Sequence, residues 1–150
     1  MSGPRYLEDF EIGACERFGC YPVSEDEVVE FARRYDPQPF HVDRAAAERS
    51  HFGGLIVSGW HTAAMYIRMI NDHGATRHAL AGLGFDDMRW PRPTRPGDLL
   101  SVESTVKATS PLQSRADRGI VTFATRILNQ RLEAVMTFDM LVLFPRRPRA

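Results

Sequence analysis

The sequence predicts an α+β fold in which an antiparallel β-sheet wraps around one long central helix. In the first half of the chain, apolar residues recur at the spacing of a helix, about 3.6 residues per turn. In the second half they alternate with polar residues, which is typical of strands that bury one face. A sheet packed on a single apolar helix satisfies both patterns. The length of 150 residues suits one domain spanning residues 1–150.

The first helix is predicted by its start and stop signals. Ser24 can cap it, and the acids at 25–27 favour its N-terminus. It should end at Tyr35 or Asp36, because Pro37 disfavours the helical conformation in the residue before it. A strand at 13–21 precedes this helix.

Residues 36–43 contain two prolines in three positions, and we expect this segment to be a stiff loop without helix. A short helix should follow at 44–49. The strongest helical pattern covers 56–72 and is apolar around most of its surface, so we expect a central helix buried on nearly all sides.

Four strands are expected after the central helix. Their predicted ranges are 84–90, 100–108, 119–130 and 134–144, with turns at 96–98 and 129–132.

Composition argues against several kinds of partner. Lys plus Arg number 19 and Asp plus Glu number 19, so the formal net charge is zero. Nucleic acid or a membrane surface would call for a positive excess. The longest apolar runs are far below the ~20 residues that cross a bilayer, and residues 1–11 do not resemble a secretory signal. We therefore expect a cytoplasmic protein with no nucleic-acid or membrane partner.

The two cysteines, Cys15 and Cys20, fit this reading. Five residues of extended chain would separate their Cα atoms by about 16 Å, which is beyond disulfide reach. Free thiols are expected in a reducing compartment.

Three segments resemble the MaoC-like dehydratase family, relatives of the (R)-specific enoyl-CoA hydratases. They are residues 35–43 (YDPQPFHVD), residues 52–60 (FGGLIVSGW), and the later WP at 90–91 with RPGD at 95–98. The resemblance covers most of residues 7–145. It implies the hotdog fold, an acyl-CoA or acyl-carrier thioester as substrate, and homodimers that pair through their sheets. It implies no metal and no organic cofactor.

The resemblance also implies an active site. Asp36 and His41 match the family's catalytic dyad, with Asp36 as base toward a water molecule and His41 orienting it. Gly59 matches the position whose backbone amide contacts the thioester oxygen. Further candidate substrate-binding residues are Ser58, Gly54, Phe40 and Trp60.

Two positions depart from the family pattern. Ser58 stands where family sequences often have histidine, and the insert between Asp36 and His41 lacks the asparagine that they often carry. Both departures leave the dyad intact and leave the acyl group open.

The chemistry explains why these residue types would be needed. Hydration of a 2-enoyl thioester requires a group that activates water, a proton for the α-carbon, and donors for the charge that develops on the thioester oxygen. A carboxylate and an imidazole that share one water can supply the first two. Backbone N–H groups at a helix N-terminus can supply the third.

Simpler interpretations exist for single residues. Asp36 could close a turn before Pro37, and His41 could be a loop histidine bonded to a backbone carbonyl. Together in one motif they favour an active site. His61, on the central helix, is expected to be a satisfied core or interface residue. A metal site built from Asp36, His41, Asp43 and His51 matches no known ligand spacing.

Three functional hypotheses follow. The first is a hydro-lyase that adds water reversibly to a 2-enoyl-CoA, giving a 3-hydroxyacyl-CoA. The second is a hotdog acyl-CoA thioesterase, although residues 55–70 contain no Asp or Glu that could serve it. The third is a non-catalytic acyl-thioester-binding subunit of a hotdog heteromer.

Overall fold

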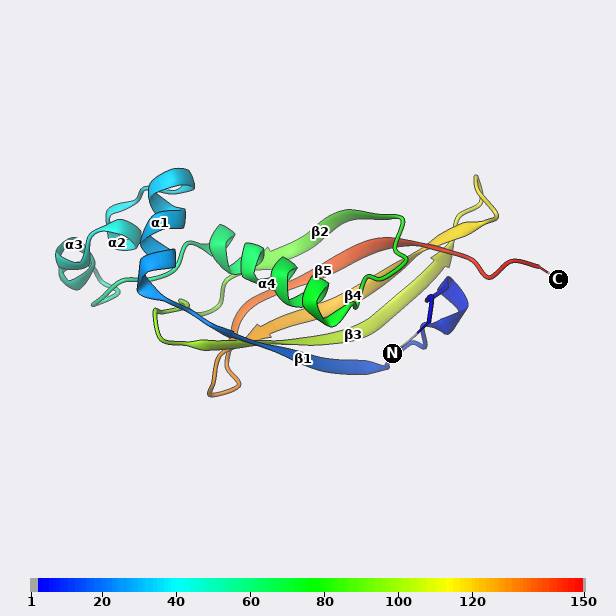
Figure 1. Ribbon diagram of the computed structural model, residues 1–150, viewed down its shortest axis with the longest axis horizontal. Coiled ribbons are helices and arrows are strands. Elements are labelled where there is room, and N and C mark those ends of the chain that lie inside the picture. The colour runs from blue at the N-terminus through cyan, green and yellow to red at the C-terminus, as the bar shows by residue number, and fades with distance from the viewer. Residues whose placement is uncertain (1–2, 150) are drawn as a thin grey trace.

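A five-stranded antiparallel sheet curves around one long helix, α4 (Gly59–His73), in the computed structural model, which describes residues 3–149 (Figure 1). The strands are β1 (Cys15–Pro22), β2 (Ala81–Arg89), β3 (Leu99–Pro111), β4 (Arg118–Leu128) and β5 (Ala134–Pro145). Their order in the sheet is β1-β3-β4-β5-β2. The α+β fold with one central helix is therefore confirmed.

The strands alternate between buried and more exposed side chains, which explains why the sheet packs on the helix with one face. Along β5, buried and half-buried residues alternate over most of the strand, as a strand covered on one face requires. β3, β4 and β5 form two long hairpins, whereas β2 pairs with β5 and not with its neighbour in sequence, β3. β1 and β2 are consequently the two edges of the sheet.

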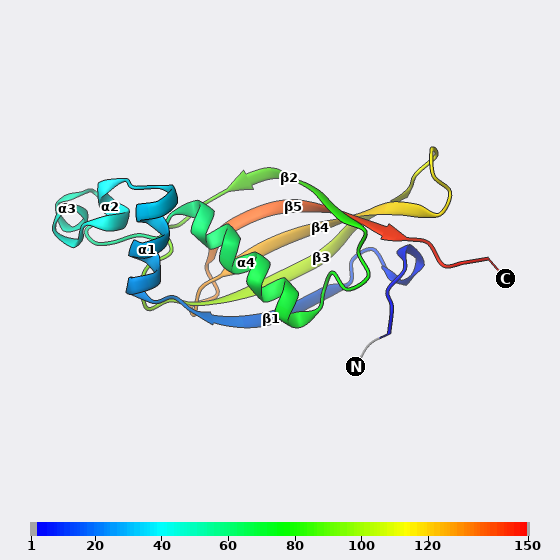
Figure 2. The same cartoon turned by 45° about the horizontal axis from the view of Figure 1, so that its top comes forward.

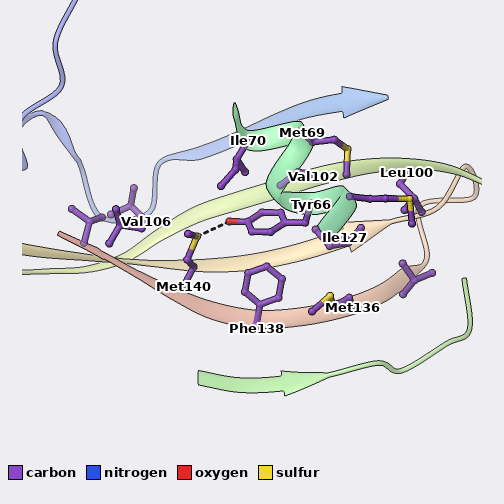
Figure 3. Packing of buried hydrophobic residues seen from close by; sticks show 14 of the residues in the cluster. Tyr66, Met69, Ile70, Leu100, Val102, Val106, Ile127, Met136, Phe138 and Met140 are labelled. Carbon is purple, nitrogen blue, oxygen red and sulfur yellow. Dashed lines mark hydrogen bonds between the residues drawn. The ribbon is translucent and has the colours of Figure 1, made fainter. Parts of the chain in front are cut away.

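One face of α4 supplies its half of the core. Met65, Tyr66, Met69 and Ile70 are buried against inward-facing residues of the sheet (Figure 3). The hydroxyl of Tyr66 donates to the sulfur of Met140 at 2.8 Å, so this buried polar group has a partner.

Burial of α4 on nearly all sides was a wrong expectation. The sheet covers only one of its faces. On the uncovered side of the helix, Trp60 is 59% exposed and Ile67 is 39% exposed. The helix also begins later than predicted. Ile56 and Val57 are buried but not helical, because their N–H groups donate to Phe40 O and Thr94 O instead of entering a helix.

Three short helices gather at the end of the molecule where α4 begins (Figure 2). They are α1 (Glu25–Tyr35), α2 (Pro39–Val42) and α3 (Arg44–Arg49); a 3₁₀ turn, η1 (Leu7–Asp9), lies near the opposite end. The Ser24 hydroxyl accepts from Glu27 N at 3.1 Å, which confirms the predicted cap of α1. Asp43 caps α3 in the same way.

The stiff, non-helical loop at 36–43 was predicted wrongly, because α2 lies inside it. Pro39 is the first residue of α2, a position where its missing N–H is not needed and its fixed φ suits a helix. The prolines therefore start a helical turn here instead of preventing one.

Two expectations about the chain as a whole can be compared with the structure. Cys15 and Cys20 are free, as predicted, and both are exposed. Within residues 3–149, no helix is long and apolar enough to cross a membrane.

Gly119→Ala is expected to destabilise the sheet. A Cβ at this position would lie 2.8 Å from the backbone oxygen of Ser110 and 2.6 Å from a methyl of Leu7. The backbone oxygen belongs to the paired strand β3 and cannot rotate away. Overpacking of this kind costs about 1–3 kcal/mol, which urea unfolding would measure. Gly84→Ala is the control, because its Cβ would meet nothing within 4 Å; equal losses in both variants would contradict the prediction.

Candidate active site

A cavity of about 470 Å³ opens where α1, α2 and the start of α4 meet the segment after β2. Four segments of the chain contribute residues to its walls, namely Asp36, Gln38, Phe40 and His41, then Phe52, Ile56 and Val57, then Gly59, Trp60 and Thr62, and finally residues 90–94. Asp36, Phe40, His41, Gly59 and Trp60 all line it, so the fold brings together five of the predicted site residues.

Asp36 is placed by the end of a helix. It is the C-cap of α1, with its N–H donating to Ala32 O, and its own φ and ψ leave the helical region. Both carboxylate oxygens are held: Oδ1 accepts from Gln38 Nε2 at 2.9 Å, and Oδ2 accepts from Ser58 Oγ at 2.7 Å. The carboxylate is thus fixed in orientation by two neutral donors.

His41 is placed by α2, the helical turn absent from the sequence prediction. Its side chain is buried, and Nδ1 lies 2.8 Å from the carbonyl oxygen of Ile56. Because a carbonyl only accepts, Nδ1 carries the proton, and Nε2 is the nitrogen available for chemistry. Nε2 lies 3.4 Å from Oδ2 of Asp36, longer than the ~2.7–3.2 Å of an ordinary N–H···O bond.

The surroundings of Asp36 favour its charged form. Partial burial acts to raise the pKa of Asp36, but the hydrogen bonds from Gln38 and Ser58 and the charge of His41 together outweigh it, and the pKa lies below its usual value. At neutral pH the group is therefore a carboxylate that can accept a proton. Its contribution to stability is present above the unfolded pKa and is lost as pH falls through the lowered one.

Ser58, predicted to bind substrate, does not line the cavity. It is fully buried and lies outside the cavity wall, and its hydroxyl serves Asp36. As the N-cap of α4 it makes no side-chain hydrogen bond to the helix. The helix gives up a cap worth about 1 kcal/mol, and the carboxylate gains a donor.

Gly59 is the first residue of α4 and forms part of the cavity wall. Its N–H belongs to the first turn of a helix, where backbone donors have no partner within the helix. A side chain here would force the ring of Trp90 to move, because a Cβ would overlap that ring, whose Nε1 donates to Gly59 O at 3.2 Å. Gly59 therefore presents only backbone in a cavity wall that it shares with Asp36 and His41.

Other predicted residues lie elsewhere. Gly54 is half-buried and outside the cavity wall, with Arg95 Nη1 3.4 Å from where its Cβ would be, so a substrate-binding role is not supported. Arg95 itself donates to Phe52 O at 2.7 Å and holds that loop. The cavity wall also contains Arg92, whose guanidinium lies 3.4 Å from the carboxylate of Glu133.

Sequence reasoning missed the role of Gln38. It lies between Asp36 and His41, in the insert that lacks the asparagine often found in the family. The side-chain amide of Gln38 donates a hydrogen bond to the carboxylate of Asp36. Across residues 3–149, no three His, Cys, Asp or Glu side chains come close enough to share a metal ion.

Ser58→Ala is expected to raise the pKa of Asp36, because it removes one donor to the carboxylate. Loss of a hydrogen bond to a charged group should cost about 1–3 kcal/mol at neutral pH. The difference between variant and wild type should shrink as pH falls through the pKa of Asp36, which urea unfolding at several pH values would measure. Ser50→Ala is the control, since that hydroxyl donates to Ala47 O, away from Asp36. A pH-independent loss from Ser58→Ala would refute this account.

Known proteins are similar to this chain in sequence and in fold. A MaoC like domain model matches residues 14–126. A crystal structure of a MaoC-like dehydratase from Rhodospirillum rubrum is 42% identical and has a TM-score of 0.86, covering 97% of this chain and 99% of that one. An (R)-hydratase from A. caviae involved in PHA biosynthesis is 26% identical with a TM-score of 0.73, covering 94% of this chain and 99% of that one.

A third relative matches over a shorter range. Mesaconyl-CoA hydratase from Cereibacter sphaeroides is 40% identical over 73 residues, which are 49% of this chain and 21% of that protein. The family match covers most of the chain, including the Asp36–His41 segment and the start of α4, and the two solved structures share its sheet and central helix. The chain therefore has the hotdog fold and belongs to the MaoC-like dehydratase family.

Proposed function

We propose that the protein catalyses the reversible addition of water to a 2-enoyl-CoA, giving a 3-hydroxyacyl-CoA. The observation that carries the proposal is the pair formed by Asp36 Oδ2 and His41 Nε2, 3.4 Å apart in the wall of a cavity that also contains the start of α4. The hydratases among the relatives support the reaction class.

Each group has a step in this reaction. Asp36, held as a carboxylate, accepts a proton from a water molecule while the water oxygen bonds to the β-carbon of the enoyl group. His41, with Nδ1–H fixed on Ile56 O, holds the water by accepting its second O–H at the unprotonated Nε2. The proton that Asp36 accepted from the water then passes to the α-carbon, which leaves Asp36 a carboxylate again. One water is thereby added across the double bond.

The start of α4 supplies the remaining requirement. During addition, negative charge develops on the thioester oxygen and is stabilised by fixed donors in a site sheltered from water. The N–H of Gly59 and the positive end of the dipole of this 15-residue helix are suited to that oxygen.

The test is hydration of 2-enoyl-CoA thioesters of varied length and branching, followed by loss of the conjugated thioester absorbance. Asp36→Asn and His41→Ala should each lower the rate by about 10²–10⁴-fold while circular dichroism remains that of the folded protein. His51→Ala is the matched control, because His51 is exposed and outside the cavity wall. Activity retained in both dyad variants would exclude the proposed roles.

The same incubations separate the hydratase from its alternatives. A thioesterase would release free CoA, which a thiol reagent detects, whereas a hydratase leaves that signal flat. A non-catalytic subunit would leave every thioester unchanged when the chain is purified alone. The lack of a carboxylate in residues 55–70 supports the hydratase over the thioesterase.

We also propose that the working form is a homodimer that pairs along the edge strand β2. Leu83 and Phe85 of β2 are exposed apolar residues on this edge of the sheet. Unpaired sheet edges of this kind favour association with another strand.

Leu83→Asp is expected to reduce the mass measured by light scattering to that of one chain, because it places a charge on this apolar edge. Ile12→Asp is the control, since Ile12 is also exposed but precedes β1 at the other edge. A wild-type chain that is monomeric at all concentrations would refute the assembly.

A further inference from the structure

A second cavity, of about 350 Å³, lies between α1, β1 and α4, next to the active-site cavity but not part of it. Tyr21, Glu27 and His61 contribute to its walls. His61 keeps only 3% of its surface exposed, and the reaction described above does not use it.

The carboxylate of Glu27 joins three elements at one point. Its Oε1 accepts from the hydroxyl of Tyr21 on β1 at 2.5 Å, and His61 Nε2 of α4 lies 3.1 Å from the same oxygen. The imidazole of His61 also stacks on Phe31, one turn further along α1, with ring centres 4.6 Å apart and planes 9° from parallel. His61 therefore holds α1 by a hydrogen bond and by a ring contact.

By attaching α4 to α1, His61 connects the two elements that carry the proposed active site. His61 lies in the first turn of α4, just after Ser58 and Gly59. α1 is a continuous helix with Asp36 as its C-cap. Glu27 and Asp36 are therefore about 14 Å apart along a rigid helix. Holding α1 against α4 fixes how closely Asp36 approaches Ser58 and Gly59.

We propose that His61 is a positioning residue that sets the placement of Asp36 against the start of α4, acting through Glu27 and Phe31 of α1. The inference rests on the proposed hydratase function for its catalytic consequence. The placement itself is a property of the fold.

The hydrogen bonding of His61 distinguishes this role from simple core packing. Its Nδ1 is buried and is the one such side-chain polar atom without a partner among the residues that the structure describes. A phenylalanine would keep the stacking on Phe31 and avoid this unpaired nitrogen. What imidazole adds over an apolar ring is the bond from Nε2 to Glu27.

The pKa values of Tyr21 and Glu27 are consistent with close contact between these groups and His61. Burial and the hydrogen bond to Glu27 raise the pKa of Tyr21 to about 12. Burial acts to raise the pKa of Glu27, but the hydrogen bonds from Tyr21 and His61 outweigh it and lower the pKa.

The chain contains its own control. At the far end of α4, His73 Nε2 lies 3.2 Å from Glu16 Oε2, and its ring stacks on Phe18 with centres 4.1 Å apart. The same two contacts therefore attach α4 to β1, away from Asp36. His61→Phe and His73→Phe make the same chemical change at the two ends of the helix.

The experiment compares these two variants of the full chain by three measurements. They are amide hydrogen exchange of residues 28–36, the pKa of Asp36 from carboxyl ¹³C NMR, and kcat and KM on a 2-enoyl-CoA that the wild type hydrates. His61→Phe should raise the exchange by about tenfold or more and shift the pKa of Asp36 toward its usual value. It should lower kcat by about 10–100-fold with KM nearly unchanged, because misplacement of a reacting group affects the transition state most. His73→Phe should leave all three at wild-type values.

A second pair of variants guards against misfolding of His61→Phe. Glu27→Gln keeps an oxygen that accepts from Tyr21 and His61 and should behave as wild type, whereas Glu27→Ala should reproduce His61→Phe. Wild-type exchange and an unchanged Asp36 pKa in both His61→Phe and Glu27→Ala would overturn the inference. If the wild-type chain hydrates no thioester, the proposed function fails, and the exchange and titration still decide the placement.

Discussion

The hydrogen bond from Ser58 to Asp36 is the contact on which the arrangement of this protein depends. It joins Asp36, the C-cap of α1, to Ser58, the N-cap of α4. The bond therefore defines where the Asp36 carboxylate lies relative to the free N–H groups at the start of α4. The sheet contributes indirectly, by fixing α4 through its buried face. Two further contacts set the remaining distances: the carbonyl of Ile56 holds His41, and His61 of α4 holds α1.

Local signals in the sequence were enough for much of the fold. The cap at Ser24, the acids after it and Pro37 fix both ends of α1 by interactions within a few residues, and the alternation of the strands is equally local. Asp36 and His41 were found because the motif joins them within one short segment. The structure places them in one cavity wall, which short-range reasoning could support but not establish.

What the sequence did not reveal depends on partners far along the chain. Ile56 and Val57 fit a helical pattern, and only the acceptors Phe40 O and Thr94 O explain why they lie outside the helix. The bond between Glu27 and His61 spans 34 residues, and nothing near either residue in the sequence indicates it. Pro39 was misjudged for a different reason: proline excludes the middle of a helix but favours its first position, and the pattern alone did not distinguish the two.

The hydroxyl of Ser58, which serves a carboxylate in place of its own helix, gives the molecule an uneven response to acid. Once Asp36 takes up a proton, its attachment to Ser58 becomes an ordinary hydrogen bond between neutral groups, and the charge that favoured it disappears. The apolar contacts beneath α4 carry no such charge. Acidification should therefore loosen the end of the molecule built from α1 and α2 while the sheet stays assembled, so that the chain would lose its reactive geometry before it loses its shape.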